Sequence, residues 1–254
     1  MMEQTKSDTK PPIKLFQAPS AFGLAGSASP PCMKLETWLR IAGVPFEPGE
    51  YPSTTKPAPK GKIPYIEDDG VLIGDSTLII EHIKRTRGVD PDLGLTKEER
   101  AIGLAFRRML KENFYWVLMH TRYGVEENWQ KWRKVLASMF VPKGAPDAAV
   151  EQANSIADNI RKIVHEYLHA QGLGRHTAEE IYQLGSAELM AVSDFLGDKS
   201  FFFGDKPTTA DAVVYTYMAQ LIELPFDSPT RELARGQKNL VDYCARMRAR
   251  FYGN

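Results

Sequence analysis

The sequence predicts a protein of two domains, a small α/β domain followed by an all-α domain. Its 254 residues are enough for one large or two modest domains. Strands and turns dominate the first part of the chain, whereas apolar residues recur at helical spacing from Thr96 onward, and the one strand-like run there, 201–203, is too short to count. We therefore assign residues 13–89 to the first domain, 90–95 to a linker and 96–254 to the second domain, after a disordered N-terminus over residues 1–12.

The first domain is predicted to begin with a strand, a loop and a helix. The apolar run Ile13–Ala18 is followed by a loop rich in Gly and Ser. Ser29 is suited to cap the helix, and Pro30 and Pro31 suit its first positions. Gly43 ends it. The apolar stripe of this helix consists of Leu35, Trp38, Leu39 and Ala42.

The rest of the first domain is predicted to be a strand, a hairpin and a second helix. The helix begins with Ser76 as its cap, runs to about Arg87 and ends at Gly88. The strands and the hairpin turn are Phe46–Tyr51, Ile63–Glu67, Asp69-Gly70 and Val71–Ile73. This order of elements is the arrangement of a thioredoxin-like domain with a mixed sheet.

Helix start signals divide the second domain. Thr96-x-x-Glu99 and Thr177-x-x-Glu180 are capping boxes, and Thr208-x-x-Asp211 is a related box with a shorter acid. Apolar stripes follow the first box and occur near the C-terminus; they contain Ile102, Phe106, Met109 and Leu110, and Leu240, Val241 and Cys244. Cys244 is therefore predicted to be a packing residue.

Composition excludes several classes of function. Lys plus Arg and Asp plus Glu both total 32, so no net charge attracts the chain to nucleic acid. The two cysteines exclude a disulfide framework and indicate a reducing compartment. No apolar run reaches the ~20 residues of a membrane helix, and no signal peptide is evident. We expect a cytoplasmic protein without membrane insertion.

Ser29-Pro30-Pro31-Cys32 places a hydroxyl and a thiol at a predicted helix N-terminus. Free amide groups and the helix dipole favour an anion such as a thiolate there. The alternative interpretation is an ordinary serine cap followed by a buried cysteine.

The dipeptide Ile63-Pro64 directly precedes the hairpin. If this bond is cis, the backbone N–H and C=O of Ile63 can pair with an extended, peptide-like ligand. The alternative is a trans proline at the edge of the sheet.

Asp75-Ser76 places a carboxylate and a hydroxyl at the start of the second helix. Together they suit a ligand with an ammonium and a carboxylate group, such as an amino acid. Simple helix capping is the alternative.

The segment His165-Glu166-x-x-His169 could bind zinc, because two histidines four residues apart share one helix face. A third ligand would be expected where Arg175 stands, and His176 lies one residue too late. We therefore expect a solvent-facing pair without bound metal.

Four segments together resemble the glutathione transferase superfamily, over nearly the whole chain from Ile13. They are Ser29-Pro-Pro-Cys32-Met-Lys, Gly61-Lys-Ile-Pro64, Asp75-Ser76 and Thr208-Thr-Ala-Asp211. The long loop before Ser29 and the run Phe226-Asp-Ser-Pro are similar to the metaxin-like branch, the failed axon connections type. The resemblance implies the glutathione transferase fold, with glutathione as co-substrate and no metal.

The resemblance also implies roles for individual residues. Ser29 holds the catalytic position, and Cys32 could act as a resolving thiol. The residues implied to hold glutathione are Lys62, Ile63, Pro64, Asp75 and Ser76. An apolar pocket for the substrate is implied at Tyr115, Met119 and Tyr123.

The predicted function is glutathione transfer by thiolate addition or displacement on a hydrophobic, electrophilic small molecule, by a homodimer. The resemblance leaves two alternatives. One is a non-catalytic interaction protein of the same fold, as in metaxin-like proteins, and the other is a thiol-disulfide reductase that uses Cys32.

Overall fold

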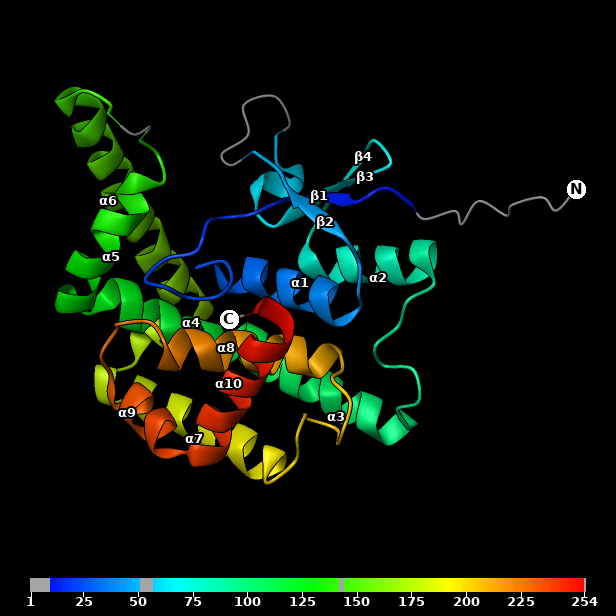
Figure 1. Ribbon diagram of the computed structural model, residues 1–254. Helices are drawn as coiled ribbons and strands as arrows, with labels where there is room; N and C mark the ends of the chain where they lie inside the picture. The colour runs from blue at the N-terminus through cyan, green and yellow to red at the C-terminus, as the bar shows by residue number, and fades with distance from the viewer. Residues whose placement is uncertain (1–9, 51–56, 142–143, 254) are drawn as a thin grey trace, which may run out of the picture.

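The computed structural model describes residues 10–50, 57–141 and 144–253. It shows a small sheet, two helices that lie between this sheet and the rest of the molecule, and a helical domain beneath them (Figure 1). The predicted fold class, a thioredoxin-like α/β domain followed by an all-α domain, is confirmed.

The sheet contains four short strands in the order β2-β1-β3-β4. β1 pairs with β2 in parallel and with β3 antiparallel, so the sheet is mixed, as predicted. Asp69 and Gly70, between β3 and β4, have φ angles of 53° and 78°, as a tight two-residue hairpin turn requires. The strands are β1 (Ile13–Phe16), β2 (Phe46–Pro48), β3 (Tyr65–Asp68) and β4 (Val71–Gly74). The last predicted residue of the second strand, Tyr51, lies outside the described residues.

The first domain has the two predicted helices, α1 (Pro30–Ile41) and α2 (Ser76–Arg87), and a short 3-10 turn, η1 (Pro59–Gly61). One prediction is corrected at the start of α2. Asp75, not Ser76, is the cap, because its Oδ1 accepts hydrogen bonds from the amides of Thr77 (2.8 Å) and Leu78 (3.2 Å). Gly88 ends α2 in the left-handed conformation, as predicted.

The second domain begins with a nearly continuous helical segment from Lys97 to Gly124, in which two π-helical turns flank α4. The three predicted capping boxes begin α3, α7 and α8. The elements are α3 (Lys97–Arg108), η2 (Met109–Phe114), α4 (Tyr115–Met119), η3 (His120–Gly124), α5 (Glu126–Ser138), α6 (Asp147–Gln171), η4 (Leu173–Arg175), α7 (Ala178–Leu196), α8 (Thr209–Ile222), α9 (Pro229–Gly236) and α10 (Lys238–Tyr252).

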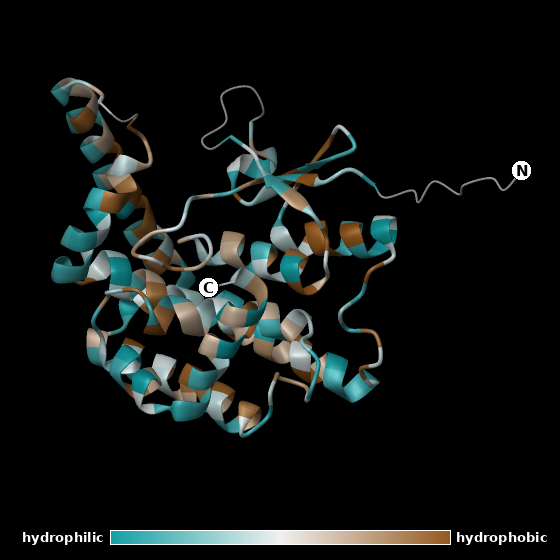
Figure 2. Cartoon of the chain, viewed as in Figure 1, coloured by the Kyte–Doolittle hydropathy of each residue, from teal (hydrophilic) through white to brown (hydrophobic). Residues whose placement is uncertain are grey.

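Helix α8 joins the two hydrophobic cores. All of its residues are buried, and Figure 2 shows it at the centre of the molecule in mostly neutral to apolar colours. Most of its apolar side chains belong to the core of the helical domain, but Ala212 packs into the core of the first domain with Trp38 and Ile83. Burial on every side explains why α8 lacks a polar face. Cys244 is buried in the helical core, as predicted.

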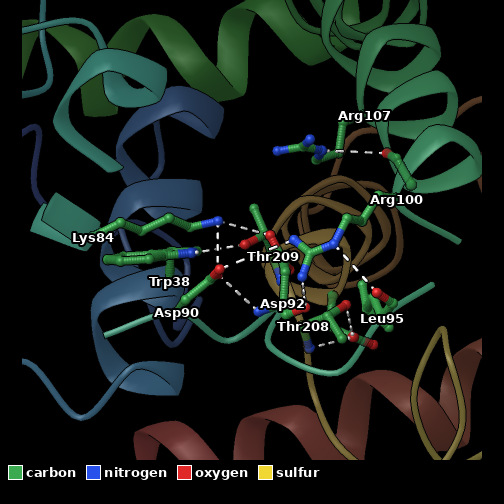
Figure 3. Close-up of polar contacts among 11 residues, drawn as sticks. Trp38, Lys84, Asp90, Asp92, Leu95, Arg100, Arg107, Thr208 and Thr209 are labelled. Carbon is green, nitrogen blue, oxygen red and sulfur yellow. Dashed lines mark hydrogen bonds and ion pairs between the residues drawn. The ribbon is translucent and has the colours of Figure 1, made fainter. Parts of the chain in front are cut away.

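The segment between α2 and α3 ties the domains together through Asp92 (Figure 3). One carboxylate oxygen of Asp92 accepts from the Thr209 amide at the start of α8, and the other accepts from Lys84 Nζ in α2, both at 2.8 Å. Trp38 Nε1 in α1 donates to Thr209 Oγ1 at 3.0 Å. These contacts hold the beginning of α8 against α1 and α2.

The predicted disordered N-terminus, residues 1–12, falls mostly on residues 1–9, which lie outside the described residues. Lys10 Nζ donates to the carbonyl of Thr86 at 2.7 Å, and the carbonyl of Pro11 accepts from Arg87 at 3.0 Å. The described chain is therefore held to α2 from Lys10. Among the helices of the described residues, none combines the length and the apolar character needed to cross a membrane.

Candidate functional site

The three sequence signals of the first domain meet at one end of the sheet. Phe16, the last residue of β1, pairs with Tyr65, the first residue of β3, which in turn pairs with Gly74 at the end of β4. The loop to Ser29 leaves from this end, Pro64 enters it, and Asp75 follows it. The strand register thus brings together segments that are far apart in the sequence.

Ser29 has the extended backbone of a helix cap, but its side chain makes no capping hydrogen bond. The predicted capping role of its hydroxyl is therefore wrong, and the half-buried hydroxyl is free of the helix amides. Pro30 and Pro31 have no amide hydrogen, and Met33 N donates to Ser29 O. Cys32 N is then the one uncommitted amide in this turn among the described residues. This helix start offers fewer anion donors than the sequence suggested.

Cys32 belongs to the first turn of α1, and its side chain is fully buried. Burial raises the pKa of its thiol to about 11, although hydrogen bonding with Ser29 acts in the opposite direction. A thiol of this kind stays protonated at neutral pH and out of reach of a disulfide. The structure therefore argues against Cys32 as a catalytic residue and against the reductase alternative, and it places Cys32 among the packing residues.

The Ile63-Pro64 peptide bond is cis, as predicted. Ile63 is half-buried, and neither its amide nor its carbonyl bonds to another described residue. Lys62 beside it is exposed. The backbone of Ile63 is thus available to an extended ligand.

Asp75 and Ser76 lie at the N-terminus of α2. Burial acts to raise the pKa of Asp75, but hydrogen bonds from the amides of Leu78 and Thr77 outweigh it, and the pKa lies below its ordinary value. Asp75 is therefore ionised at neutral pH. Its second oxygen and the hydroxyl of the buried Ser76 bond to no other described residue. Capping and ligand binding are compatible here, because capping uses only one carboxylate oxygen.

The loop before Ser29 is fixed by two buried residues of the helical domain. Arg122 in η3 donates to Ala28 O at 3.0 Å and to Gln220 Oε1 at 2.7 Å, and Gln220 in α8 donates to Ser27 O at 2.9 Å. Neither Arg122 nor Gln220 is among the functional residues predicted from the sequence. A charged residue inside an aromatic run and an amide inside an apolar helix were the signals that could have identified them.

Two of the three residues predicted to line a substrate pocket lie in the core. Met119 and Tyr123 are 4% and 6% exposed, and the Tyr123 ring packs against Trp129 and Trp132. They are packing residues in this conformation, since aromatic neighbours already fill the space around Tyr123. Tyr115 is half-buried, and its role in substrate binding stays a prediction.

The histidine pair of α6 faces solvent, as predicted. His165 and His169 are exposed, and His165 Nε2 lies 3.1 Å from the carbonyl oxygen of Tyr123. Within residues 10–50, 57–141 and 144–253, no three His, Cys, Asp or Glu side chains are grouped so that they could hold a metal ion.

Comparisons with known proteins agree with this geometry. A glutathione S-transferase N-terminal domain model matches residues 30–129, and a C-terminal domain model matches residues 185–247. The chain is 31% identical to isoprene-epoxide glutathione S-transferase of Rhodococcus, over 88% of this chain and 92% of that enzyme. It is 34% identical to Failed axon connections of Drosophila melanogaster over 93% of its length, but it spans only 57% of that protein. Mouse metaxin-1 is 27% identical, over 92% of this chain and 73% of metaxin-1.

Solved structures share the fold at low sequence identity. A glutathione transferase of Phanerochaete chrysosporium superposes with a TM-score of 0.61 at 15% identity, covering 95% of this chain and 98% of that one. Glutathione S-transferase III in its apo form superposes with a TM-score of 0.57 at 18% identity, covering 96% and 94%.

Proposed function

Because the chain belongs to the glutathione S-transferase family, we propose that it binds glutathione at the end of the sheet and transfers its thiolate to a hydrophobic electrophile. The observation that carries this proposal is the meeting of Ser29, Ile63 and Asp75-Ser76 at one end of the sheet. The Ile63 backbone, one Asp75 oxygen and the Ser76 hydroxyl bond to no described residue, and the Ser29 hydroxyl contacts the buried Cys32 thiol but no helix amide. The nearly full-length similarity to a glutathione-using enzyme supports it.

Each of these groups matches one part of glutathione. The Ser29 hydroxyl would donate a hydrogen bond to the sulfur and stabilise its ionised form. The backbone of Ile63 would pair with the cysteinyl residue. The free oxygen of Asp75 would bind the ammonium of the γ-glutamyl group, and the Ser76 hydroxyl would bind its carboxylate. An electrophile would then be attacked by the sulfur, with the leaving group or the opened ring taking the electron pair.

Ser29→Ala should raise the pKa of the thiol of bound glutathione by about one to two units, because the anion loses a hydrogen bond worth roughly 1.5–3 kcal/mol. Titration of the thiolate absorbance of the complex against pH measures this shift. Cys32→Ala is the matched control, since its side chain is buried in the same helix turn and should leave the titration unchanged.

Two results would contradict the proposal. A wild-type chain that neither binds immobilised glutathione nor turns over an aryl halide is not a transferase of this kind. Loss of activity in Cys32→Ala with no effect of Ser29→Ala would assign the chemistry to the protein's own thiol.

A second candidate function is binding of a protein partner without transfer. It is favoured by the packing of the long loop, in which Ala21, Leu24 and Ala28 are buried in the core of the helical domain. Gln220 of α8 also holds this loop through the carbonyl of Ser27, two residues before Ser29. A purified chain that binds a protein partner but not glutathione would support this function over transfer.

We also propose a cytoplasmic homodimer. Val71, Leu78 and Leu104 are large apolar side chains that are 57%, 52% and 48% exposed on β4, α2 and α3. A second copy of the chain would cover them. Sedimentation equilibrium should give twice the mass of the chain; a mass equal to one chain at micromolar concentration would refute the dimer.

A further inference from the structure

A cavity of about 200 Å³ lies where α1, α2 and α3 meet η2 and α8. Four of its lining side chains are cations, Lys34, Arg107, Arg108 and Lys111. We propose that this cavity binds a small oxyanion. The oxyanion is either a free phosphate-like ion or a carboxylate group of bound glutathione.

The cavity has more positive charge than its carboxylates neutralise. Glu112 lies 2.8 Å from Arg108 and 3.6 Å from Lys111, so it partly neutralises these two. Arg107 has no carboxylate partner among the described residues, and its Nε donates to the carbonyl of Gly103 at 3.3 Å. Figure 3 shows the Arg107 side chain extending from α3. Glu81, the one carboxylate in the lining, is exposed and forms no ion pair with a described residue.

Lys34 is the strongest indication of a ligand. It is 5% exposed, lines the cavity, and forms neither a hydrogen bond nor an ion pair with any described residue. Burial of an unpaired ammonium is costly, and the positive charges of Lys111 and Arg107 add to the cost. Burial is the main cause that lowers the pKa of Lys34 to about 8, and Asp75 and Glu112 only partly oppose it. A bound anion would supply the missing negative charge.

One hydroxyl donor and apolar walls define the kind of anion. Thr77 offers its hydroxyl to the cavity. Thr209 also lines the cavity, but its hydroxyl accepts from Trp38 Nε1 and hydrogen-bonds with Asp92, so it is not counted as a donor to the ligand. The remaining wall is apolar and consists of Ile80, Leu104 and Val213. A compact group with two or three oxygens, such as phosphate or carboxylate, fits this lining, whereas an extended polyanion does not.

The oxyanion has two possible sources. The cavity does not contain Ser29, Ile63 or Ser76, so it can hold a free anion independently of the proposed transfer reaction. Thr77, however, directly follows Ser76, so the α-carboxylate of a γ-glutamyl group could also reach Lys34. Competition between phosphate and glutathione distinguishes these sources.

The test is calorimetric titration of the full chain with inorganic phosphate at pH 7, in a buffer without other oxyanions. Wild-type protein should bind phosphate, and Lys34→Met or Lys111→Met should bind it at least about tenfold more weakly, because each loses a charged hydrogen bond. Lys162→Met, which removes an exposed lysine on α6, is the charge-matched control and should bind like the wild type. Binding to the wild type should weaken above pH 8 as Lys34 loses its proton.

Lys111 is partly exposed, so its variant tests the site independently of any change in the packing around the buried Lys34. Phosphate binding that glutathione abolishes would assign the site to the ligand carboxylate, and binding unaffected by glutathione would assign it to a free oxyanion. Absence of phosphate binding to the wild type, or equal affinities in Lys34→Met, Lys111→Met and Lys162→Met, would overturn the proposal. These results do not depend on whether the chain transfers glutathione.

Discussion

Asp211→Asn should lower the free energy of unfolding by about 4 kcal/mol, although it changes only one oxygen to an amide. Asp211 is fully buried, and its two oxygens accept four hydrogen bonds. The donors are Phe202 N (2.7 Å), Thr208 N (2.8 Å), Thr208 Oγ1 (2.9 Å) and Tyr243 OH (3.1 Å). Asparagine keeps one acceptor oxygen, so its NH₂ group would face donors that then have no acceptor.

Urea unfolding at neutral pH measures this loss. The control is Glu180→Gln in the capping box of α7, where Thr177 N donates to the carboxylate at the protein surface. Water can replace the lost contact there, so the expected change is much smaller than that of Asp211→Asn. A loss below 1 kcal/mol in Asp211→Asn would show that the buried network rearranges to accept an amide.

Lys34→Met should raise the free energy of unfolding at pH 7, by about 3 kcal/mol. The pKa of Lys34 falls from 10.5 to about 8 in the folded state, mainly through burial. Below pH 8 the ammonium is present in both states, so the folded state carries the full cost of the buried charge. Above pH 10.5 the amine is neutral in both states and the cost disappears. The methionine side chain fills a similar volume without charge.

Unfolding curves at pH 7 and pH 10.5 check this expectation. The advantage of Lys34→Met should be largest at pH 7 and close to zero at pH 10.5. The exposed Lys162→Met should differ from the wild type by less than about 0.5 kcal/mol at both values. Destabilisation of Lys34→Met at pH 7 would show that the ammonium already has a stabilising partner. If the cavity binds oxyanions, phosphate should reduce the advantage, because it stabilises only the wild type.

The sequence predicts most of the fold because many of its signals are local. The Asp69-Gly70 turn and the three capping boxes depend on residues within a few positions of one another, so their chemistry can be recognised without tertiary information. The meeting of Ser29, Pro64 and Asp75 also follows from local signals, once the strand order of a thioredoxin-like sheet is assumed.

Features that depend on tertiary packing cannot be predicted from the local sequence. Lys34 lies four residues before Trp38 and therefore shares the buried stripe of α1, but its burial becomes evident only once α2 and α3 cover it. Arg122 is a loop anchor only because the loop folds back onto η3. Asp75 rather than Ser76 caps α2 because its φ of 75° aims the carboxylate at the helix amides. None of these arrangements can be recognised from the residues that neighbour them in the sequence.

The Asp92 contacts affect how this chain could be recombined with its relatives. A chimera joined at residues 90–95 would separate the carboxylate from the Thr209 amide it caps, and Trp38 from its acceptor. It would also replace Ala212, the residue that α8 contributes to the core of the first domain. Domain exchange should therefore succeed only when the first turns of α8 are transferred together with residues 13–95, so the unit of exchange is larger than the thioredoxin-like domain.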